Sequence, residues 1–576
     1  MEATAERLAG VLLPVFSTRR RGDLGIGDTE GLRQWIDWAA EHSVGFIQVL
    51  PINENGSEES PYSAISSMAL DPIYLTLDTA HVPWLSESEI SAARIALGPA
   101  LDAPEVDYPL VRRIKRNLLE LAWSKFHELD DSARDDYEAF RQHERGWLDD
   151  YSLFRLLMEH HGESLSWDQW PHDCHTPRRA RAYVDQMRQH DAAGVDYRLG
   201  YFVFVQWLCY QQWDRLKKHA DAKHVMLMGD MPIGVSWHSS DVFFQPEQFH
   251  LEWFGGSPPE GHHVDDPFFQ QWGQNWGVPL YRWDHMQSED FAWWRGRVSH
   301  LTRFFRMFRI DHILGFYRIY AFPWNPARNA EFIGLTHDEA AKLTHGRLPH
   351  WVARADDNEE NRRANRADGD PRLRAVIDAA GGARVIAEDL GWVPSYVRPH
   401  LQELGIAGYR IPHWDCDATG HPLTGEQFPE NSFAVYSTHD HDPINGIWRA
   451  CHEIVERSRA SSDGESADAV HGARWTLRVL GNFAGIPVDG AGQCPPFTEA
   501  IQLSLIKALL ATRSRYAGLM VTELFDLNVR INRPGSHRGN WKFRIPWTID
   551  EIMQDRRLSG SCRQFASIIG ITGRAP

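Results

Sequence analysis

The chain has 576 residues, 43% of them hydrophobic, so it exceeds one average domain and can bury a large core. A formal net charge of −18 argues against a nucleic-acid-binding protein, which needs a basic surface to neutralise phosphates. The 24 tryptophans suit either a large core or contact with the faces of sugar rings.

Cysteine usage and the N-terminus indicate a compartment. The six cysteines are scattered, with no pair at metal-ligand spacing, and this is typical of reduced thiols in a cytosolic protein. The first seven residues lack the basic start and apolar core of a signal peptide, and no apolar run is long enough to cross a membrane. We therefore expect a cytoplasmic protein that is not membrane-bound.

Eight short apolar runs predict eight strands, and most are followed within a few residues by Gly, Pro, Asp or Asn. Helical patterns separate many of them; in residues 29–42, for example, Leu32, Trp35, Ile36 and Ala39 share one face, with Asp28 or Thr29 available as cap. Residues 291–305 and 393–404 repeat this pattern. Strands that alternate with helices predict an α/β fold, a (β/α)8 TIM barrel. The predicted strands are residues 11–16, 46–50, 225–228, 307–310, 384–387, 409–411, 433–437 and 519–522.

The uneven spacing of these runs locates large insertions. Residues 1–52 are expected to form the first part of the catalytic barrel, and residues 53–220 inserted, mainly helical subdomains. Residues 221–576 would complete the barrel, with a lid loop near 255–267. Helical signals in the insertion cover residues 111–126, 149–160 and 201–219. The polar residues 355–371 are expected to form a solvated excursion before the fifth strand. The polar residues 458–471 are expected to form a break before a pair of helices.

Three acidic positions stand at the ends of predicted strands. Arg309 and Asp311 close the run 304–310, and alternation along a strand places both side chains on one face. Glu388 and Asp389 close residues 384–387, and Asp440 closes residues 433–438. Carboxylates at the carboxyl ends of separate barrel strands are typical of enzymes that act on sugars.

These carboxylates fit retaining glycosidic chemistry, which needs a nucleophilic carboxylate and a carboxylic acid that protonates the leaving oxygen. Asp311 suits the nucleophile because a neighbouring cation, Arg309, lowers a carboxyl pKa. Glu388 suits the acid/base if burial or Asp389 raises its pKa. Asp440 could hydrogen-bond sugar hydroxyls as the oxocarbenium ion forms. An aspartate at a strand end is often a turn former or helix cap, but three on separate strands favour the catalytic interpretation.

Several motifs resemble those of a known protein family, and they follow one another in that family's order. They are Gly10-Val11-Leu12-Leu13-Pro14, Gly25-Ile26-Gly27-Asp28, Leu50-Pro51, Ser60-Pro61-Tyr62-Ser63, Gly229-Asp230-Met231-Pro232-Ile233, Gly273-Gln274-Asn275-Trp276-Gly277-Val278-Pro279-Leu280-Tyr281-Arg282-Trp283, Ala387-Glu388-Asp389-Leu390-Gly391, Thr438-His439-Asp440 and Gly539-Asn540-Trp541. Over residues 10 to about 545 the chain resembles the 4-α-glucanotransferases of the amylomaltase or disproportionating-enzyme family, within the α-amylase clan.

The resemblance implies roles and substrates. Asp311 would be the nucleophile, Glu388 the acid/base and Asp440 the transition-state stabiliser of an enzyme of maltose and glycogen metabolism. Its donors and acceptors would be maltooligosaccharides or other α-1,4-glucans. Predicted substrate-binding residues are Arg309 and His439, which could instead orient the carboxylates, with Tyr62, Asp230, Gln274, Trp276 and Asn540. For the last five the alternatives are core packing (Tyr62, Trp276), turn formation (Asn540) and loop hydrogen bonds (Asp230, Gln274).

The sequence also departs from the family pattern, and these changes bear on acceptor preference and product size. They are His238-Ser239-Ser240-Asp241-Val242 after the third strand, Pro258-Pro259-Glu260-Gly261-His262-His263 in the lid, Asp71 before Pro72, His441-Asp442-Pro443 after the third carboxylate, and Glu523-Leu524-Phe525-Asp526 near the last strand.

We expect no metal and no organic cofactor. Adjacent histidines such as His262 and His263 point to opposite sides of an extended chain, and no carboxylate-rich calcium loop is present. Two other functions stay open at this point: an α-1,4-glucan hydrolase built from the same residues, and a catalytically silent glucan-binding protein that keeps the barrel. The three carboxylates argue against the silent protein, whereas only the resemblance favours transfer over hydrolysis.

Overall fold

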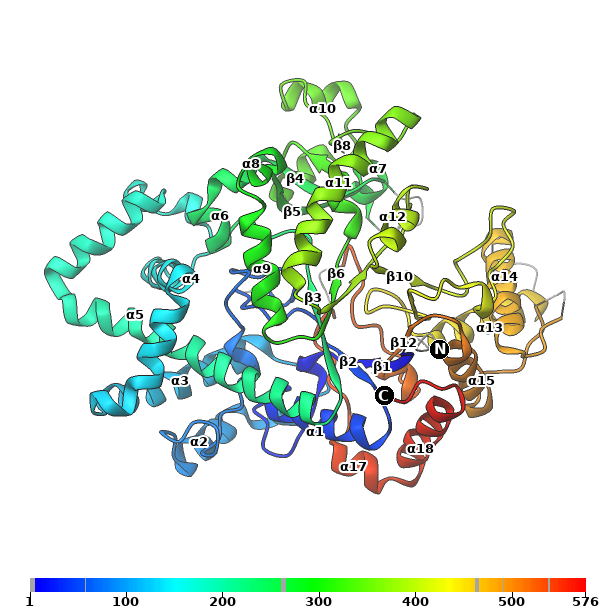
Figure 1. The fold of residues 1–576 in the computed structure, drawn as a ribbon, viewed down its shortest axis with the longest axis horizontal. Coiled ribbons are helices and arrows are strands. Elements are labelled where there is room, and N and C mark those ends of the chain that lie inside the picture. Colours follow the sequence, from blue (N-terminus) through cyan, green and yellow to red (C-terminus); the bar gives the residue numbers. More distant parts are fainter. Residues whose placement is uncertain (1–5, 57, 260–265, 461–465, 490–491, 537–538) are drawn as a thin grey trace.

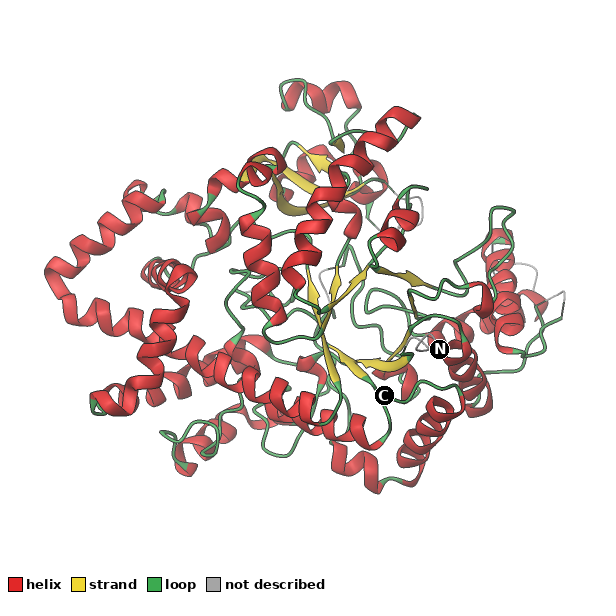
Figure 2. Cartoon of the chain, in the orientation of Figure 1, coloured by secondary structure: helices red, strands yellow, loops and turns green. Residues whose placement is uncertain are grey.

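A closed barrel of parallel strands lies at the centre of the molecule, with helices around it (Figures 1 and 2). The computed structural model describes residues 6–56, 58–259, 266–460, 466–489, 492–536 and 539–576. Within them the barrel closes in the order β1-β12-β11-β10-β9-β6-β3-β2. Its strands are β1 (Leu8–Leu12), β2 (Phe46–Gln48), β3 (Met226–Met231), β6 (Met307–Ile310), β9 (Arg384–Ala387), β10 (Ala407–Arg410), β11 (Ser432–Ala434) and β12 (Tyr516–Met520).

The predicted TIM barrel is confirmed, since each of the eight predicted runs overlaps one barrel strand. The bounds of β6 and β9 were predicted without error. The first prediction, residues 11–16, was wrong in extent, because β1 ends at Leu12 and Val15–Ser17 form a short 3-10 helix. Pro14 comes between the two segments; it lacks an N–H and cannot continue the strand ladder.

The helices fall into barrel and accessory groups. Residues 29–42 were predicted as a helix, and α1 (Thr29–Glu41) begins after Asp28, whose side chain accepts a hydrogen bond from the backbone N–H of Gly31. The described barrel-side and C-terminal helices are α1, α6 (Ser240–Phe244), α7 (Pro267–Trp272), α8 (Trp283–Ser288), α9 (Ala292–Thr302), α10 (His337–Leu343), α11 (Glu359–Ala380), α12 (Val397–Glu403), α13 (Ile444–Ala460), α14 (Ala467–Ala484), α15 (Glu499–Ala511), α16 (Val521–Leu524), α17 (Ile549–Gln554) and α18 (Arg556–Ile571).

Between β2 and β3 the chain forms α2 (Glu87–Leu97), α3 (Tyr108–His127), α4 (Asp135–His160) and α5 (Pro177–Ala222). Two buried amides on α5 attach this region to the segment that leaves the barrel. Gln206 exchanges hydrogen bonds with both backbone groups of Leu70, and Gln212 does the same with Thr76, each at 2.9 Å. The glutamines thus satisfy backbone groups that a neighbouring strand would otherwise pair.

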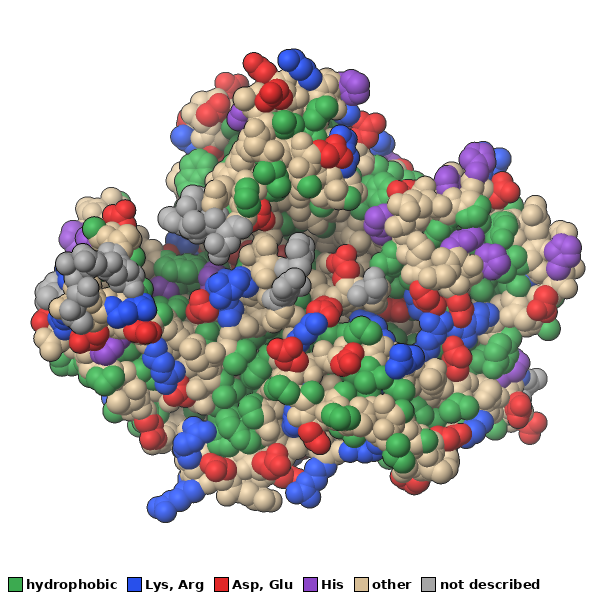
Figure 3. All heavy atoms as spheres, turned by 180° about the vertical axis from the view of Figure 1, so that it is seen from behind, with side chains coloured by type: hydrophobic (Ala, Val, Ile, Leu, Met, Phe, Trp, Pro, Cys, Tyr) green, Lys and Arg blue, Asp and Glu red, His purple; other side chains and the backbone are tan. Residues whose placement is uncertain are grey.

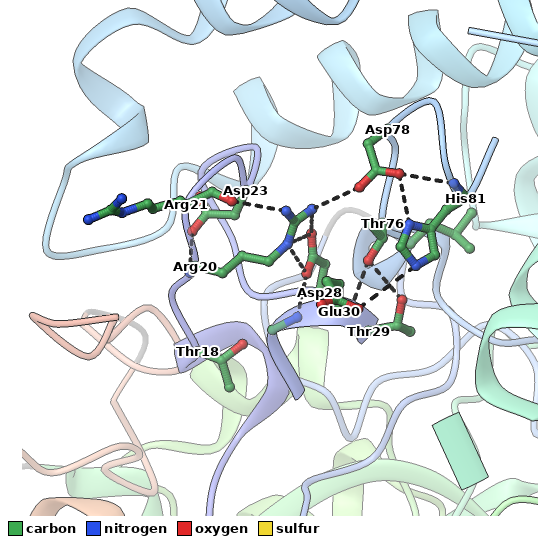
Figure 4. Close-up of polar contacts among 12 residues, drawn as sticks. Thr18, Arg20, Arg21, Asp23, Asp28, Thr29, Glu30, Thr76, Asp78 and His81 are labelled. Atoms are coloured by element: carbon green, nitrogen blue, oxygen red, sulfur yellow. Dashed lines mark hydrogen bonds and ion pairs between the residues drawn. The ribbon is translucent and has the colours of Figure 1, made fainter. Parts of the chain in front are cut away.

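The Gly-Ile-Gly-Asp motif has a structural role at the start of α1 (Figure 4). Asp28 caps the helix and also accepts a bidentate pair of hydrogen bonds from Arg20, both 2.8 Å at their shortest. Arg20 reaches on to Asp78 at 3.8 Å, and Asp78 binds His81 at 2.7 Å. This network joins the loop after β1 to the accessory region.

A second, antiparallel sheet was not predicted. It has the order β5-β4-β7-β8 and is built from β4 (Phe249–Ser257), β5 (Gln274–Tyr281), β7 (Ile319–Phe322) and β8 (His350–Val352). Its aromatic core includes Trp324 stacked on Phe332 with ring centroids 3.7 Å apart. The glycines and the proline within β4 and β5 are typical of loops, and for this reason the sequence pattern did not predict these strands.

Residues 355–371 are largely exposed or half-buried, as predicted, but they form no irregular excursion, because α11 (Glu359–Ala380) covers most of that stretch. Asn358 caps this helix, and the buried Asn365 bonds to Arg354 and Asp356. The polar first half of the helix is therefore held by side-chain bonds, whereas Leu373, Val376 and Ala380 in its second half pack into the core. The polar break predicted at 458–471 is shorter than expected, because α13 extends to Ala460 and α14 begins at Ala467; residues 461–465 lie outside the described part.

The predicted lid at 255–267 is described only at its two ends, in β4 and at the start of α7; residues 260–265, including His262 and His263, lie outside the described residues.

Among the helices that the structure describes, none combines the length and apolarity needed to cross a bilayer. On the face opposite to Figure 1, acidic and basic side chains are interspersed (Figure 3).

Gly10 is required by close packing inside the barrel. A Cβ built on Gly10 in β1 would lie 2.1 Å from the ring of Phe46, which is fully buried and packs against Phe433 with ring centroids 5.5 Å apart. We expect Gly10→Ala to lower the free energy of unfolding by about 1–3 kcal/mol, the usual cost of overpacking. Urea unfolding measures this. Gly472→Ala in α14 is the control, because nothing lies within 4 Å of its added Cβ; equal stability of the two variants would contradict the packing argument.

Candidate active site

Asp311 stands directly after β6, in an ion pair with Arg309. The Arg309 side chain is 2% exposed; its Nη2 lies 2.8 Å from Asp311 Oδ1, and its Nη1 lies 2.9 Å from both carboxylate oxygens of Asp230 in β3. Asp230 is likewise buried, whereas 27% of the Asp311 side chain is exposed. The guanidinium of Arg309 thus bonds both the buried carboxylate of Asp230 and the partly exposed carboxylate of Asp311.

Glu388 follows β9, which pairs with β6 so that Ile310 lies beside Ala387. Asp311 and Glu388 are therefore the next residues on adjacent strands. Glu388 Oε2 accepts a hydrogen bond of 2.8 Å from the backbone N–H of His312. His312 has φ of 45°, a left-handed conformation that histidine adopts more readily than most residues, and this turn accompanies the N–H bond to Glu388.

Glu388 and Asp311 differ in their electrostatic surroundings. Burial raises the pKa of Glu388 to about 7; Arg309 opposes the rise, and the negative charge of Asp311 adds to it. Among the described residues Glu388 has no ion-pair partner within 4 Å, while Asp311 has Arg309. One carboxyl group is thus suited to hold a proton near neutral pH, and the other is paired with a cation.

Asp440 lies in the loop after β11 and is 30% exposed. Asn532 Nδ2 donates to its Oδ1 at 2.5 Å, His439 Nε2 lies 3.4 Å from its Oδ2, and Arg530 donates to its backbone carbonyl. Sequence reasoning missed Asn532 and Arg530. Asn532 stands before Arg-Pro-Gly, where an asparagine suggests a turn, and no local signal links it to a carboxylate 92 residues earlier.

Tyr62 joins this group from the loop after β2, and His439 precedes Asp440 in the loop after β11. The Tyr62 hydroxyl donates to Asp230 Oδ2 at 2.7 Å and lies 3.0 Å from His439 Nε2, and the two rings stack at 5.5 Å. Burial, with the positive charge of Arg309, lowers the pKa of His439 to about 3. His439 is therefore a neutral imidazole that can orient neighbours through hydrogen bonds.

The remaining predicted residues divide into two groups. Trp276 in β5 lies edge-to-face with His312, ring centroids 4.8 Å apart, so it borders the turn after Asp311. Gln274 begins β5, half-buried, opposite Ser257. The Asn540 amide, in contrast, bonds to the backbone of Arg533 and Ser536, the turn role given above as its alternative, and within the described residues it makes no hydrogen bond to the three carboxylates.

Asp389, the neighbour of Glu388, points into a different environment. It is fully buried, accepts from the Tyr409 backbone N–H at 2.6 Å, and lies 3.0 Å from Arg398 and 3.3 Å from Arg410. Because side chains alternate along an extended chain, Asp389 faces away from the Asp311 side. It supports the barrel wall.

Several departures from the family pattern have local structural partners. Asp71 receives a bidentate pair from Arg112, at 3.0 and 2.8 Å. Asp241 accepts from the backbone N–H of Ser67 at 2.8 Å. Glu523 accepts from the backbone N–H groups of Met520 and Ile444 at 2.9 and 3.0 Å. These acidic residues hold loops and helix starts together.

Comparisons with known proteins agree with the fold and the motifs. Residues 13–550 match the model of glycoside hydrolase family 77, described as 4-alpha-glucanotransferase. The 4-alpha-glucanotransferase of Chlamydia caviae is 29% identical, with 94% of this chain and 92% of the relative covered. That of Thermus thermophilus is 28% identical, with 94% and 95% covered.

A solved structure, amylomaltase from Streptococcus agalactiae in complex with acarbose, shares the fold, with a TM-score of 0.75 and 22% identity over 99% of this chain and 100% of that one. Because the family model spans most of its length, the chain belongs to the 4-alpha-glucanotransferase family, glycoside hydrolase family 77.

Proposed function

We propose that this enzyme transfers a segment of an α-1,4-glucan to the 4-hydroxyl of an acceptor glucose or glucan, with retention, and that Asp311 is the nucleophile and Glu388 the acid/base. The single observation that carries the assignment is the asymmetry between the two carboxyl groups. Asp311 is paired with Arg309, whereas burial raises the pKa of Glu388 to about 7 and no cation within 4 Å among the described residues neutralises it.

The reaction then takes two displacements. A carboxylate oxygen of Asp311 attacks the anomeric carbon while Glu388 gives its proton to the departing 4-oxygen, which leaves a β-linked glycosyl ester on Asp311. The 4-hydroxyl of an acceptor sugar attacks this ester from the opposite face. Glu388, now ionised, takes the acceptor's proton, and Asp311 departs as a carboxylate with the new α-linkage formed.

The other residues take supporting roles in this proposal. Asp440 is partly exposed and held by Asn532, so it can accept hydrogen bonds from sugar hydroxyls that tighten as positive charge develops on the ring. Arg309 and Asp230 are 2% exposed and already bonded to each other, and they act as positioning residues for Asp311. Tyr62 and Trp276 are half-buried and can border the donor sugar.

Maltotriose tests the overall function. A transferase is expected to convert pure maltotriose into glucose and a ladder of longer maltooligosaccharides, because an acceptor sugar replaces water in the second step. Chromatography of the products over time measures this. Glucose and maltose alone would make the protein a hydrolase, and a complete lack of turnover would favour a silent glucan-binding protein.

Asp311→Asn tests the nucleophile. The amide is nearly isosteric with the carboxylate but cannot form the glycosyl ester, so we expect kcat to fall by about 10³-fold or more, roughly 4 kcal/mol of barrier. The unfolding midpoint and circular dichroism should stay close to those of the wild type. Wild-type turnover by a variant verified by mass spectrometry would remove Asp311 from this role.

Glu388→Gln tests the acid/base. Transfer from maltooligosaccharides should be crippled, since their leaving sugars need a proton, whereas α-glucosyl fluoride should still glycosylate Asp311 because fluoride needs none. The ester should accumulate and be detected by mass spectrometry of the denatured protein. Added azide needs no deprotonation, so it should release α-glucosyl azide, the retained product.

Glu523→Gln is the matched control for Glu388→Gln. Burial raises the pKa of Glu523 to about 7 as well, but this side chain binds backbone N–H groups at the start of α13 and α16. An amide can accept from only one of these N–H groups, so the variant should lose some stability, but the ratio of its activities with the two donors should equal that of the wild type. Equal damage with both donors in Glu388→Gln, without a trapped ester, would place the proton donor elsewhere.

A further inference from the structure

Trp392 is the most exposed of the described tryptophans, with 74% of the residue open to solvent. It lies in the loop between β9 and α12, four residues after Glu388. Tryptophan is largely buried in most proteins, because its apolar area is costly to leave in water. Packing against the rest of the chain therefore does not account for this side chain.

The loop that carries Trp392 runs beside the segment that follows β6. At its start, Glu388 Oε2 accepts from the backbone N–H of His312 at 2.8 Å, and the Glu388 carbonyl accepts from the backbone N–H of Ile313 at 3.2 Å. At its end, the guanidinium of Arg318 lies over the Trp392 ring, with Cζ 5.7 Å from the ring centroid. Contacts at both ends thus fix the position of Trp392 relative to Glu388.

Arg318 is itself held in place. It is 3% exposed, forms an ion pair with Asp356, and its Cζ lies 3.5 Å from the ring centroid of Trp351 in β8. A guanidinium is attracted to the face of each ring by the negative charge of the π-electrons. Within the loop, Asp389 is anchored in the barrel wall. The Trp392 ring is therefore positioned without a ligand, and most of its surface is open.

The proximity of Trp392 to Glu388 indicates which part of the glucan it would contact. An acid/base protonates the oxygen of the departing sugar, so that sugar lies against Glu388 and the rest of the departing chain continues away from the nucleophile. The acceptor enters by the same path, because the second displacement reverses the first. Within the described residues, Tyr62 and Asp440, which face the donor sugar in the proposed function, make no bond to Trp392.

We propose that Trp392 is a stacking surface for the acceptor glucan and contacts an acceptor sugar beyond the first. The inference deepens the proposed function and rests on it. The first acceptor sugar must touch Glu388 to exchange a proton, whereas Trp392 lies four residues further along the loop. The apolar face of a glucose ring fits the open side of the indole. Acceptors of two or more sugars gain this contact and glucose does not, so Trp392 favours longer acceptors over glucose and water.

Acceptor kinetics with radiolabelled α-glucosyl fluoride as the donor test this proposal, because the label follows only the transferred glucose. With Trp392→Ala, KM for maltotriose as the acceptor should rise about threefold or more, while kcat/KM for glucose as the acceptor stays within about twofold of the wild type. Trp392→Phe keeps an aromatic face and should restore much of the affinity for maltotriose.

Trp475→Ala in α14 is the matched control. Trp475 is also exposed, at 37%, but its helix contributes none of the candidate site residues, so this variant should match the wild type with both acceptors. If Trp392→Ala does not fold, Trp392→Met takes its place, since methionine keeps apolar bulk without an aromatic face.

An unchanged KM for maltotriose in the folded variant without the ring would overturn the proposal. So would an equal loss with maltotriose and glucose, because that result would mean that Trp392 positions Glu388 rather than the acceptor. Failure of the proposed function would instead appear in the wild-type enzyme, as label released in free glucose and in no longer saccharide with either acceptor.

Discussion

The buried guanidinium of Arg309 is the interaction on which the site geometry depends. It bonds Asp230 of β3 through one nitrogen and Asp311 through another, and Asp230 in turn accepts from Tyr62. A planar guanidinium with five donors can hold two carboxylates in fixed directions, which a lysine ammonium cannot do in the same geometry. Removal of Arg309 would leave Asp230 as an unpaired buried charge, so both stability and the position of Asp311 would suffer.

The different surroundings of the neighbouring carboxylates Glu388 and Asp389 follow from the face of the chain on which each side chain lies. Glu388 and Asp389 are neighbours, yet alternation sends Glu388 towards Asp311 and Asp389 into the barrel wall, where Arg398 and Arg410 hold it. Glu388 accepts from the His312 N–H and feels the charges of both Arg309 and Asp311, but it has no ion-pair partner within 4 Å among the described residues. Burial without a paired cation is what raises its pKa, and the same sequence pair shifted by one residue would exchange the two environments.

Contacts between the accessory helices and the barrel loops hold the segment that follows Tyr62. Gln206 and Gln212 of α5 fix the backbone of the segment that follows Tyr62, and the bond between Asp241 and Ser67 fixes the same segment from the side of α6. The long insertion between β2 and β3 therefore helps to position the segment that follows Tyr62.

The sequence by itself determined the barrel, the order of its strands and the three carboxylates at their ends, because each depends on a short apolar run followed by a polar loop. Only the tertiary structure decided what depends on distant partners. The polar first half of α11 is stabilised by side-chain bonds such as that of Asn365, the antiparallel sheet pairs strands interrupted by glycine, and Asn532 reaches Asp440. In each case the contact joins residues whose pairing cannot be seen in the local pattern of the sequence. Hydrogen bonds and packing act over a few ångströms in space, whatever the separation of the residues along the chain.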